Sequence, residues 1–317
     1  MFYDSYYRHC PHCNCNTGIV KIGTTSSGRQ RYKCKNCDKT WVSKAHTQVL
    51  AKNIWYDLVF RNMNYSELAD KYKMSERNVR RRLDLYTPPE IIPTRADVIA
   101  MDVTYFGRSW GLLTITNVYN GKALYCEPVN GYETVWDYER AIRHLRKHGV
   151  YPKVAIIDGK KGVINMLEEY NIKVQFCQFH QLKIITQCLT RKPVLLPNIE
   201  LRNIALTLAH TNYKSFTTMV YGWKLRNEIW LQEKSRTEDG KWGYTHRLTR
   251  RAINSLITNL PYLFTYQEYP ELNIPNTNNK IEGLHSELKR RLNNHRGLKK
   301  DQKIQFARIF FSRRTEV

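Results

Sequence analysis

Three acidic residues stand where acidic side chains are costly unless they have a chemical role. Asp102 interrupts the apolar run Val98–Tyr105, and Asp158 ends a second apolar run that begins at Val154. Burying an unpaired carboxylate is costly because its charge loses contact with water. Glu282 borders the apolar stripe of a predicted amphipathic helix. We therefore interpret these three acids as candidate catalytic residues.

Three converging carboxylates repel one another unless a cation lies between them. Oxygen ligands of this kind favour Mg²⁺ or Mn²⁺. Two such ions, about 3.5–4 Å apart, can activate an attacking oxygen and stabilise the leaving oxygen of a phosphodiester. If the strands that carry Asp102 and Asp158 are neighbours, their carboxylates meet at one sheet edge. Each acid alone also has an ordinary structural explanation, such as capping a strand edge, so the hypothesis depends on the set of three.

The first 45 residues carry a second set of ligand-type residues. Two Cys-x-x-Cys pairs have the spacing of a zinc site with one structural ion: Cys10, Cys13, Cys34 and Cys37. A segment this short cannot support a core alone, so the metal would supply its folding free energy. His12 and Cys15 are second choices as ligands. The alternative is that the cysteines are coincidental or form redox pairs.

Residues 64–83 have the layout of a helix-turn-helix. Ser66 is expected to cap the first helix and Ser75 the second, with a turn at Lys73 and Met74. Arginine and asparagine read guanine and adenine edges in the major groove. The side chains expected to face outward on the second helix are of these types: Arg77, Asn78, Arg81 and Arg82. The alternative is a basic, solvated helix in an ordinary bundle.

From Arg95 onward, short β-branched runs alternate with amphipathic segments. The predicted order β-β-β-α-β-α-β-α indicates an α/β fold with a mixed sheet flanked by helices. Residues from about 190 to 270 are predicted to form an all-helical insertion. The expected domains are therefore a zinc ribbon over 1–45, a helix-turn-helix domain over 46–90, and a catalytic domain over 95–317.

The charge of the chain indicates its partner. Fifty-one Lys and Arg residues against 28 Asp and Glu residues give a formal charge of +23. An excess of this size destabilises a compact state unless a polyanion compensates it, and nucleic acid is the usual polyanion. No apolar run approaches the roughly 20 residues that span a bilayer, so we expect no membrane association. The N-terminus has no apolar signal core, which favours a cytoplasmic location.

The C-terminal segment is the most basic part of the chain. Between Lys289 and Arg314 there are ten Lys or Arg residues against one Asp. This density predicts a track for DNA phosphates that includes Lys289 and Arg290, with a solvated tail as the alternative. In the helical insertion, four aromatic residues are expected to pack in the core rather than stack on bases: Trp223, Trp230, Trp242 and Tyr244.

Four short motifs resemble those of the Mutator-type bacterial insertion-sequence transposases. They are Met101-Asp-Val-Thr, Ile157-Asp-Gly-Lys-Lys-Gly, Cys177-Gln-Phe-His, and Asn276-Thr-Asn-Asn-Lys-Ile-Glu followed by Lys289. The resemblance implies a ribonuclease-H-like core with a helical insertion before the last acid. It implies that Asp102, Asp158 and Glu282 are the catalytic triad and that Lys289 faces the DNA. The role of Cys177 and His180 stays open between structural support, a DNA contact, and a zinc site that would need two more ligands.

Together these features predict a transposase that cuts the ends of its element and joins the 3′-hydroxyl to target DNA. Its expected partner is double-stranded DNA, as element ends and as target, in the bacterial nucleoid. A homodimer or larger assembly is expected because two ends must be synapsed. The alternatives are a non-catalytic, sequence-specific DNA-binding regulator and a DNA nuclease without strand transfer.

Overall fold

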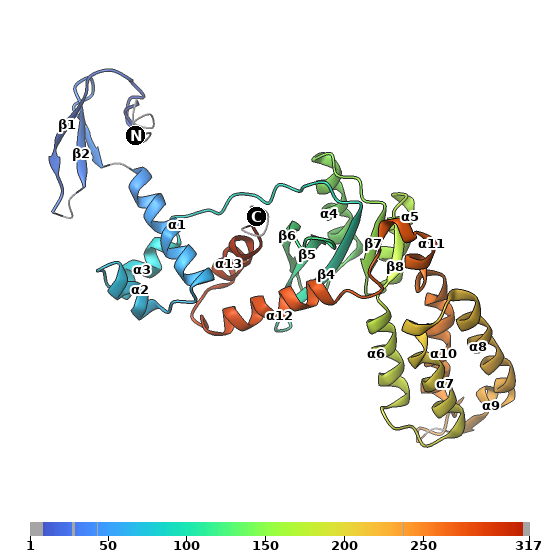
Figure 1. The fold of residues 1–317 in the computed structure, drawn as a ribbon. Coiled ribbons are helices and arrows are strands. Elements are labelled where there is room, and N and C mark those ends of the chain that lie inside the picture. Colours follow the sequence, from blue (N-terminus) through green and yellow to red (C-terminus); the bar gives the residue numbers. More distant parts are fainter. Residues whose placement is uncertain (1–8, 27–28, 43, 237, 313–317) are drawn as a thin grey trace. The chain divides into compact units, whose positions relative to one another are not determined.

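The computed structural model describes residues 9–26, 29–42, 44–236 and 238–312 (Figure 1). These residues form two compact units. The first comprises the described residues up to Pro88 together with Arg291–Ile309, and the second comprises Pro89–Arg290 with the described residues from Phe310 onward. The sequence-based boundaries did not anticipate that residues 291–309 belong with the N-terminal unit.

The first unit begins with a small antiparallel sheet. Its strands follow one another in the order β1 (Ile19–Thr24), β2 (Gln30–Cys34) and β3 (Thr40–Val42). Tyr32 of β2 lies opposite Trp41 of β3, and their rings stack with centroids 6.0 Å apart. Three short strands bury little surface on their own.

Three helices follow the sheet: α1 (Lys44–Phe60), α2 (Tyr65–Lys71) and α3 (Glu76–Leu83). Ser75 caps α3 as predicted, since its hydroxyl accepts the Asn78 N–H at 3.4 Å. The predicted cap Ser66 is wrong. Asn64 caps α2 because its carboxamide accepts the Glu67 N–H while the Glu67 carboxylate accepts the Asn64 N–H, a reciprocal capping box that Ser66 cannot form.

Residues 291–309 add to this unit. The Arg291 guanidinium donates to the carbonyl oxygens of Val59 and Phe60 at the end of α1, at 2.9 and 3.2 Å. Helix α13 (Lys300–Ser312) buries Phe306 and Ala307 completely. The segment is therefore a packed helix rather than a solvated tail, and its last two basic residues, Arg313 and Arg314, lie outside the described residues.

A five-stranded sheet forms the centre of the second unit, in the order β6-β5-β4-β7-β8. Antiparallel pairing joins β4 (Val98–Phe106), β5 (Trp110–Asn117) and β6 (Ala123–Asn130). Parallel pairing joins β4, β7 (Val154–Ile157) and β8 (Lys173–Phe176). The predicted α/β class with a mixed sheet is confirmed.

The two faces of this sheet have different cores. On one face, Ile99 and Met101 pack with residues of α4 (Val135–Lys147) and α5 (Lys161–Glu169). On the other, Val98 and Ala100 pack with Ile281 of α12 (Asn279–Asn293). Because side chains alternate along a strand, residues 98, 100 and 102 of β4 share the α12 face.

The chain between β8 and α12 in the sequence forms a helical region with its own core (Figure 1). Its helices are α6 (Gln178–Leu189), α7 (Leu196–Leu206), α8 (Tyr213–Arg226), α9 (Glu228–Gln232), α10 (Arg247–Asn259) and α11 (Thr265–Glu268), with 3₁₀ turns at Leu208–His210, Leu260–Tyr262 and Pro270–Leu272. The all-helical prediction is wrong in one place. A hairpin of β9 (Lys234–Arg236) and β10 (Trp242–Tyr244) interrupts the helices. Gly240, at φ +74°, supplies a left-handed residue in the connection between the two strands.

Within the described part of the chain, no helix has both the length and the apolar character needed to cross a membrane.

Candidate active site

The first two candidate acids lie on neighbouring strands. Ala100 of β4 is the register partner of Ile156 of β7 in the parallel pairing. Asp102 and Asp158 each lie two residues beyond this pair, at equivalent positions along parallel chains. The even spacing of Asp102 from Ala100, which packs with Ile281, assigns its carboxylate to the α12 face, and Asp158 follows the end of β7 next to it. The strands that lead to Asp102 and Asp158 are therefore neighbours in the sheet, as the hypothesis required.

The electrostatics of Asp158 fit a bound cation. Burial raises the pKa of the Asp158 carboxyl, and the nearby Asp102 carboxylate raises it further. The charges of His180 and Lys160 act in the opposite direction. A divalent cation between neighbouring carboxylates offsets their repulsion, and hard oxygen ligands of this kind suit such an ion. Asp102 and Asp158 can thus serve as ligands of Mg²⁺ or Mn²⁺.

Glu282 lies in the first turn of α12 and faces His180 of α6. The Glu282 Oε1 and His180 Nδ1 atoms are 3.6 Å apart. Both atoms are buried, and neither has a hydrogen-bond partner among the described residues. The charge of His180 also lowers the pKa of Asp158, so this histidine lies near both Asp158 and Glu282.

Asn278 fixes the start of α12 beside β4 and β8. Its backbone N–H donates to the Cys177 Sγ at 3.3 Å, and its side-chain amide donates to the Met101 carbonyl at 3.4 Å. Burial raises the pKa of the Cys177 thiol. These contacts place the residues that precede Glu282 next to the strand that carries Asp102.

His285 is a site residue that the sequence reasoning missed. Its Nδ1 lies 3.0 Å from the Asp102 Oδ2, and its side chain is 6% exposed. The other Asp102 oxygen, Oδ1, accepts the Val103 N–H at 2.8 Å. The available signal was helical spacing, because a residue three positions after Glu282 shares its face of α12.

Glu133, between β6 and α4, is a further acid that was missed. Burial raises the pKa of its carboxyl, and the Asp158 charge raises it further, while Lys160 opposes this effect at 3.9 Å. The Tyr138 hydroxyl donates to its carboxylate at 3.2 Å. No apolar run surrounds Glu133 in the sequence, so only the folded chain brings it close to Asp158.

Two groups of ligand-type side chains in the described ranges have ligand atoms that all lie within 4.8 Å of one another. One is Cys10, Cys13, Cys15 and Cys34, and the other is Cys177, His180 and Glu282. The three candidate acids, all of them described, do not form a group of this kind. The first group could hold a structural metal such as zinc, as the cysteine pairs predicted.

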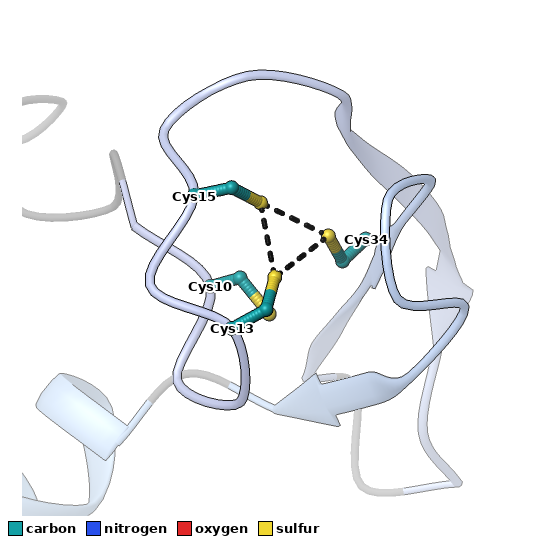
Figure 2. A group of neighbouring side chains, drawn as sticks. All are labelled: Cys10, Cys13, Cys15 and Cys34. Carbon is teal, nitrogen blue, oxygen red and sulfur yellow. Dashed lines mark hydrogen bonds between the residues drawn. The ribbon is translucent and has the colours of Figure 1, made fainter.

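The cysteine group differs from the predicted ligand set in one member. Figure 2 shows Cys15 directed toward Cys13 and Cys34, and the Cys15 Sγ lies 3.3 and 3.2 Å from theirs. Asn14, at φ +56°, turns the chain so that the Cys15 carbonyl accepts the Cys10 N–H at 2.7 Å. The predicted ligand Cys37 is not in the group of four, although its Sγ lies 3.6 Å from that of Cys10. Cys15 is therefore a candidate ligand of the same standing as the predicted four cysteines.

The candidate DNA-binding side chains are largely open to solvent. Arg77, Asn78 and Arg81 are exposed on α3, whereas Arg82 is half-buried. Burial lowers the pKa of Arg82, and the charges of Arg29 and Arg81 lower it further. The other two candidates, Lys289 and Arg290, are exposed on α12.

The aromatic residues of the helical region divide into two kinds. Trp223 is fully buried and donates to the Pro197 carbonyl at 3.1 Å, as expected of a core residue. Trp230 is half-buried and stacks on His246. The packing prediction is wrong for Trp242, which is 68% exposed on β10, and Tyr244 on the same strand is also exposed.

A search of the chain against models of known protein families found no match.

Proposed function

We propose that the chain is a DNA transposase of an insertion sequence, with a ribonuclease-H-like catalytic core. The observation that carries this proposal is the parallel pairing of β4 with β7, which brings Asp102 and Asp158 to equivalent positions. The strand order β6-β5-β4-β7-β8, with β5 antiparallel to both neighbours, supports the proposed core. Glu282, from the helix that covers the same sheet face, would be the third acid.

In this proposal Asp102, Asp158 and Glu282 hold two Mg²⁺ or Mn²⁺ ions. When bound, such ions activate the attacking oxygen and stabilise the leaving oxygen of a phosphodiester. The chain itself orients the ligands, since the Val103 N–H and His285 fix both oxygens of Asp102. Cleavage by water would free a 3′-hydroxyl, which then attacks target DNA without a covalent bond to the protein.

The proposed partner is double-stranded DNA, as element ends and as target. Three side chains of α3 are exposed and of the types that read base edges: Arg77, Asn78 and Arg81. Lys289 lies seven residues after Glu282, which is two helical turns along the same face of α12. A cation at this position suits the DNA phosphates next to the reacting bond. A homodimer or larger assembly would hold two element ends together.

The test is a cleavage and joining assay on labelled DNA that contains the ends flanking the gene, with Mg²⁺ or Mn²⁺. Asp102→Asn, Asp158→Asn and Glu282→Gln should each retain DNA binding and lower cleavage by at least about 100-fold, or roughly 2.7 kcal/mol of transition-state stabilisation. Asp97→Asn is the matched control, because Asp97 precedes β4 and pairs with Lys153 at 3.6 Å, outside the site. This control should cleave normally.

Three outcomes would contradict the proposal in different ways. Unchanged cleavage in all three variants would remove the active-site assignment. Cleavage without joining by the unmodified chain would identify a nuclease. Specific binding without metal-dependent cleavage would identify a regulator.

A further inference from the structure

Beside the proposed catalytic acids lies a donor set of a different chemical kind. Cys177 precedes α6, His180 lies in the first turn of α6, and Glu282 lies in the first turn of α12. One sulfur, one imidazole nitrogen and one carboxylate oxygen from these residues all lie within 4.8 Å of one another. Three side chains from two separate parts of the sequence thus converge on a single point.

The hydrogen bonding of this cluster is incomplete. His180 Nδ1 and Glu282 Oε1 are buried and have no partner among the described residues, although they lie only 3.6 Å apart. A buried nitrogen and oxygen that face one another without bonding partners are atoms that an ion between them would satisfy. The Cys177 Sγ accepts the Asn278 N–H at 3.3 Å, which holds the thiol in place beside the other two ligands.

The donor types select a particular class of metal. Thiolate and imidazole ligands suit Zn²⁺ and other borderline transition metals, whereas Mg²⁺ prefers oxygen ligands and water. Three protein ligands of mixed sulfur, nitrogen and oxygen type leave a fourth, open position in a tetrahedral zinc site. We propose that Cys177, His180 and Glu282 form a second zinc site, distinct from the N-terminal cysteine group.

This inference bears on the proposed function through one shared residue. Glu282 belongs to both the zinc ligand set and the proposed Mg²⁺ ligand set, so Zn²⁺ bound at this site withdraws it from the catalytic acids. The zinc ligand set itself depends only on the geometry of α6, α12 and the end of β8. The proposed zinc site can therefore be tested independently of DNA cleavage.

The experiment counts zinc ions bound to the full-length chain after equilibration with buffered Zn²⁺ and removal of free metal by gel filtration. The unmodified chain should bind two ions. Cys177→Ser, His180→Ala and Glu282→Gln should each bind one, and so should Cys34→Ser, which removes a ligand of the N-terminal group. Cys188→Ser is the matched control, because Cys188 is a buried cysteine of α6 outside both groups and its variant should keep two ions.

The result that overturns the inference is a single zinc ion per unmodified chain that Cys34→Ser abolishes. Two ions retained in His180→Ala would overturn it as well. Because His180 is partly exposed, this variant tests the site even where Cys177→Ser fails to fold. Loss of one ion in each of these variants would uphold the zinc site, whether or not the chain cleaves DNA. Absence of cleavage by the unmodified chain from which this zinc has been removed, supplied with Mg²⁺, would count against the proposed function alone.

Discussion

Asp57 of α1 is a buried carboxylate that joins the N-terminal helices, and its side chain is 4% exposed. Lys71 Nζ and the Tyr72 hydroxyl both donate to its Oδ2, at 2.5 and 2.6 Å. Arg61 lies 3.3 Å from Oδ1. Burial alone would raise the pKa of Asp57, but these hydrogen bonds and charges outweigh it and hold the pKa below its usual range.

Asp57→Asn should lower the free energy of unfolding by about 1–3 kcal/mol at neutral pH, because Lys71 and Tyr72 lose a charged acceptor. The folded pKa of Asp57 is depressed, so its contribution is complete above the ordinary aspartate pKa of about 3.9 and is lost as the pH falls through the folded value. The stability difference between the unmodified chain and the variant should therefore shrink below about pH 4.

Thermal unfolding of both proteins, measured from neutral pH to below about pH 4, checks this prediction. Asp70→Asn, which alters an exposed acid of α2, is the control, and a pH-independent difference would contradict the assignment.

The sequence singled out individual candidate site residues where one strand or one spacing decided the matter. Asp102 and Asp158 stand out because one interrupts an apolar run and the other ends one, and an apolar run indicates burial. His285 and Glu133 carry no such local signal. Their relevance depends on contacts with Asp102 and Asp158 across the fold, which no single sequence shows.

At the scale of elements, the turn after β7 has one special requirement. Gly159 follows Asp158 with φ +101°, a conformation that residues with a side chain rarely adopt. A Cβ at this position would lie 1.8 Å from Phe176 Cε2, and Phe176 is buried in the core. The turn that directs Asp158 out of the sheet therefore requires glycine for both its backbone angle and its space.

Gly159→Ala should destabilise the chain by about 2–5 kcal/mol, the sum of backbone strain and the displacement of a buried ring. Gly149→Ala is the matched control. Gly149 has φ +75°, but a Cβ added there would meet no described atom within 4 Å, so only the backbone cost applies. Chemical denaturation of both variants separates the two effects. Equal losses of unfolding free energy in the two variants would show that the Phe176 ring moves aside without destabilising the chain.

Some strands could be predicted from the local sequence pattern and others could not. The apolar run that begins at Val154 and ends at Asp158 forms the strand β7, because a continuous run of apolar residues defines it locally. The β9–β10 hairpin was missed because three-residue strands are too short for any periodicity. Asp239 and Gly240 were the available signal, and the amphipathic segments on either side obscured it.

At the scale of the whole molecule, charge is the dominant feature. The formal charge of the chain is +23, and a chain with this excess repels itself. A nucleic-acid partner releases condensed counterions when Lys and Arg residues neutralise its phosphates. Charge thus predicts the class of partner from composition alone, whereas the position of each contact depends on the fold.

The proposed DNA binding should therefore be strongly dependent on salt. The logarithm of the association constant should fall linearly with the logarithm of the salt concentration, with a slope of about −0.9 for each phosphate neutralised. Lys289→Ala should make this slope shallower by about one, because the exposed Lys289 on α12 is proposed to contact a phosphate. Lys153→Ala removes the same charge from a side chain that pairs with Asp97, and it should leave the slope nearly unchanged.

Fluorescence anisotropy titrations at several salt concentrations measure both slopes. Equal changes in the two variants would mean that total charge, rather than a defined phosphate contact, governs binding, and a slope near zero would refute the DNA partner.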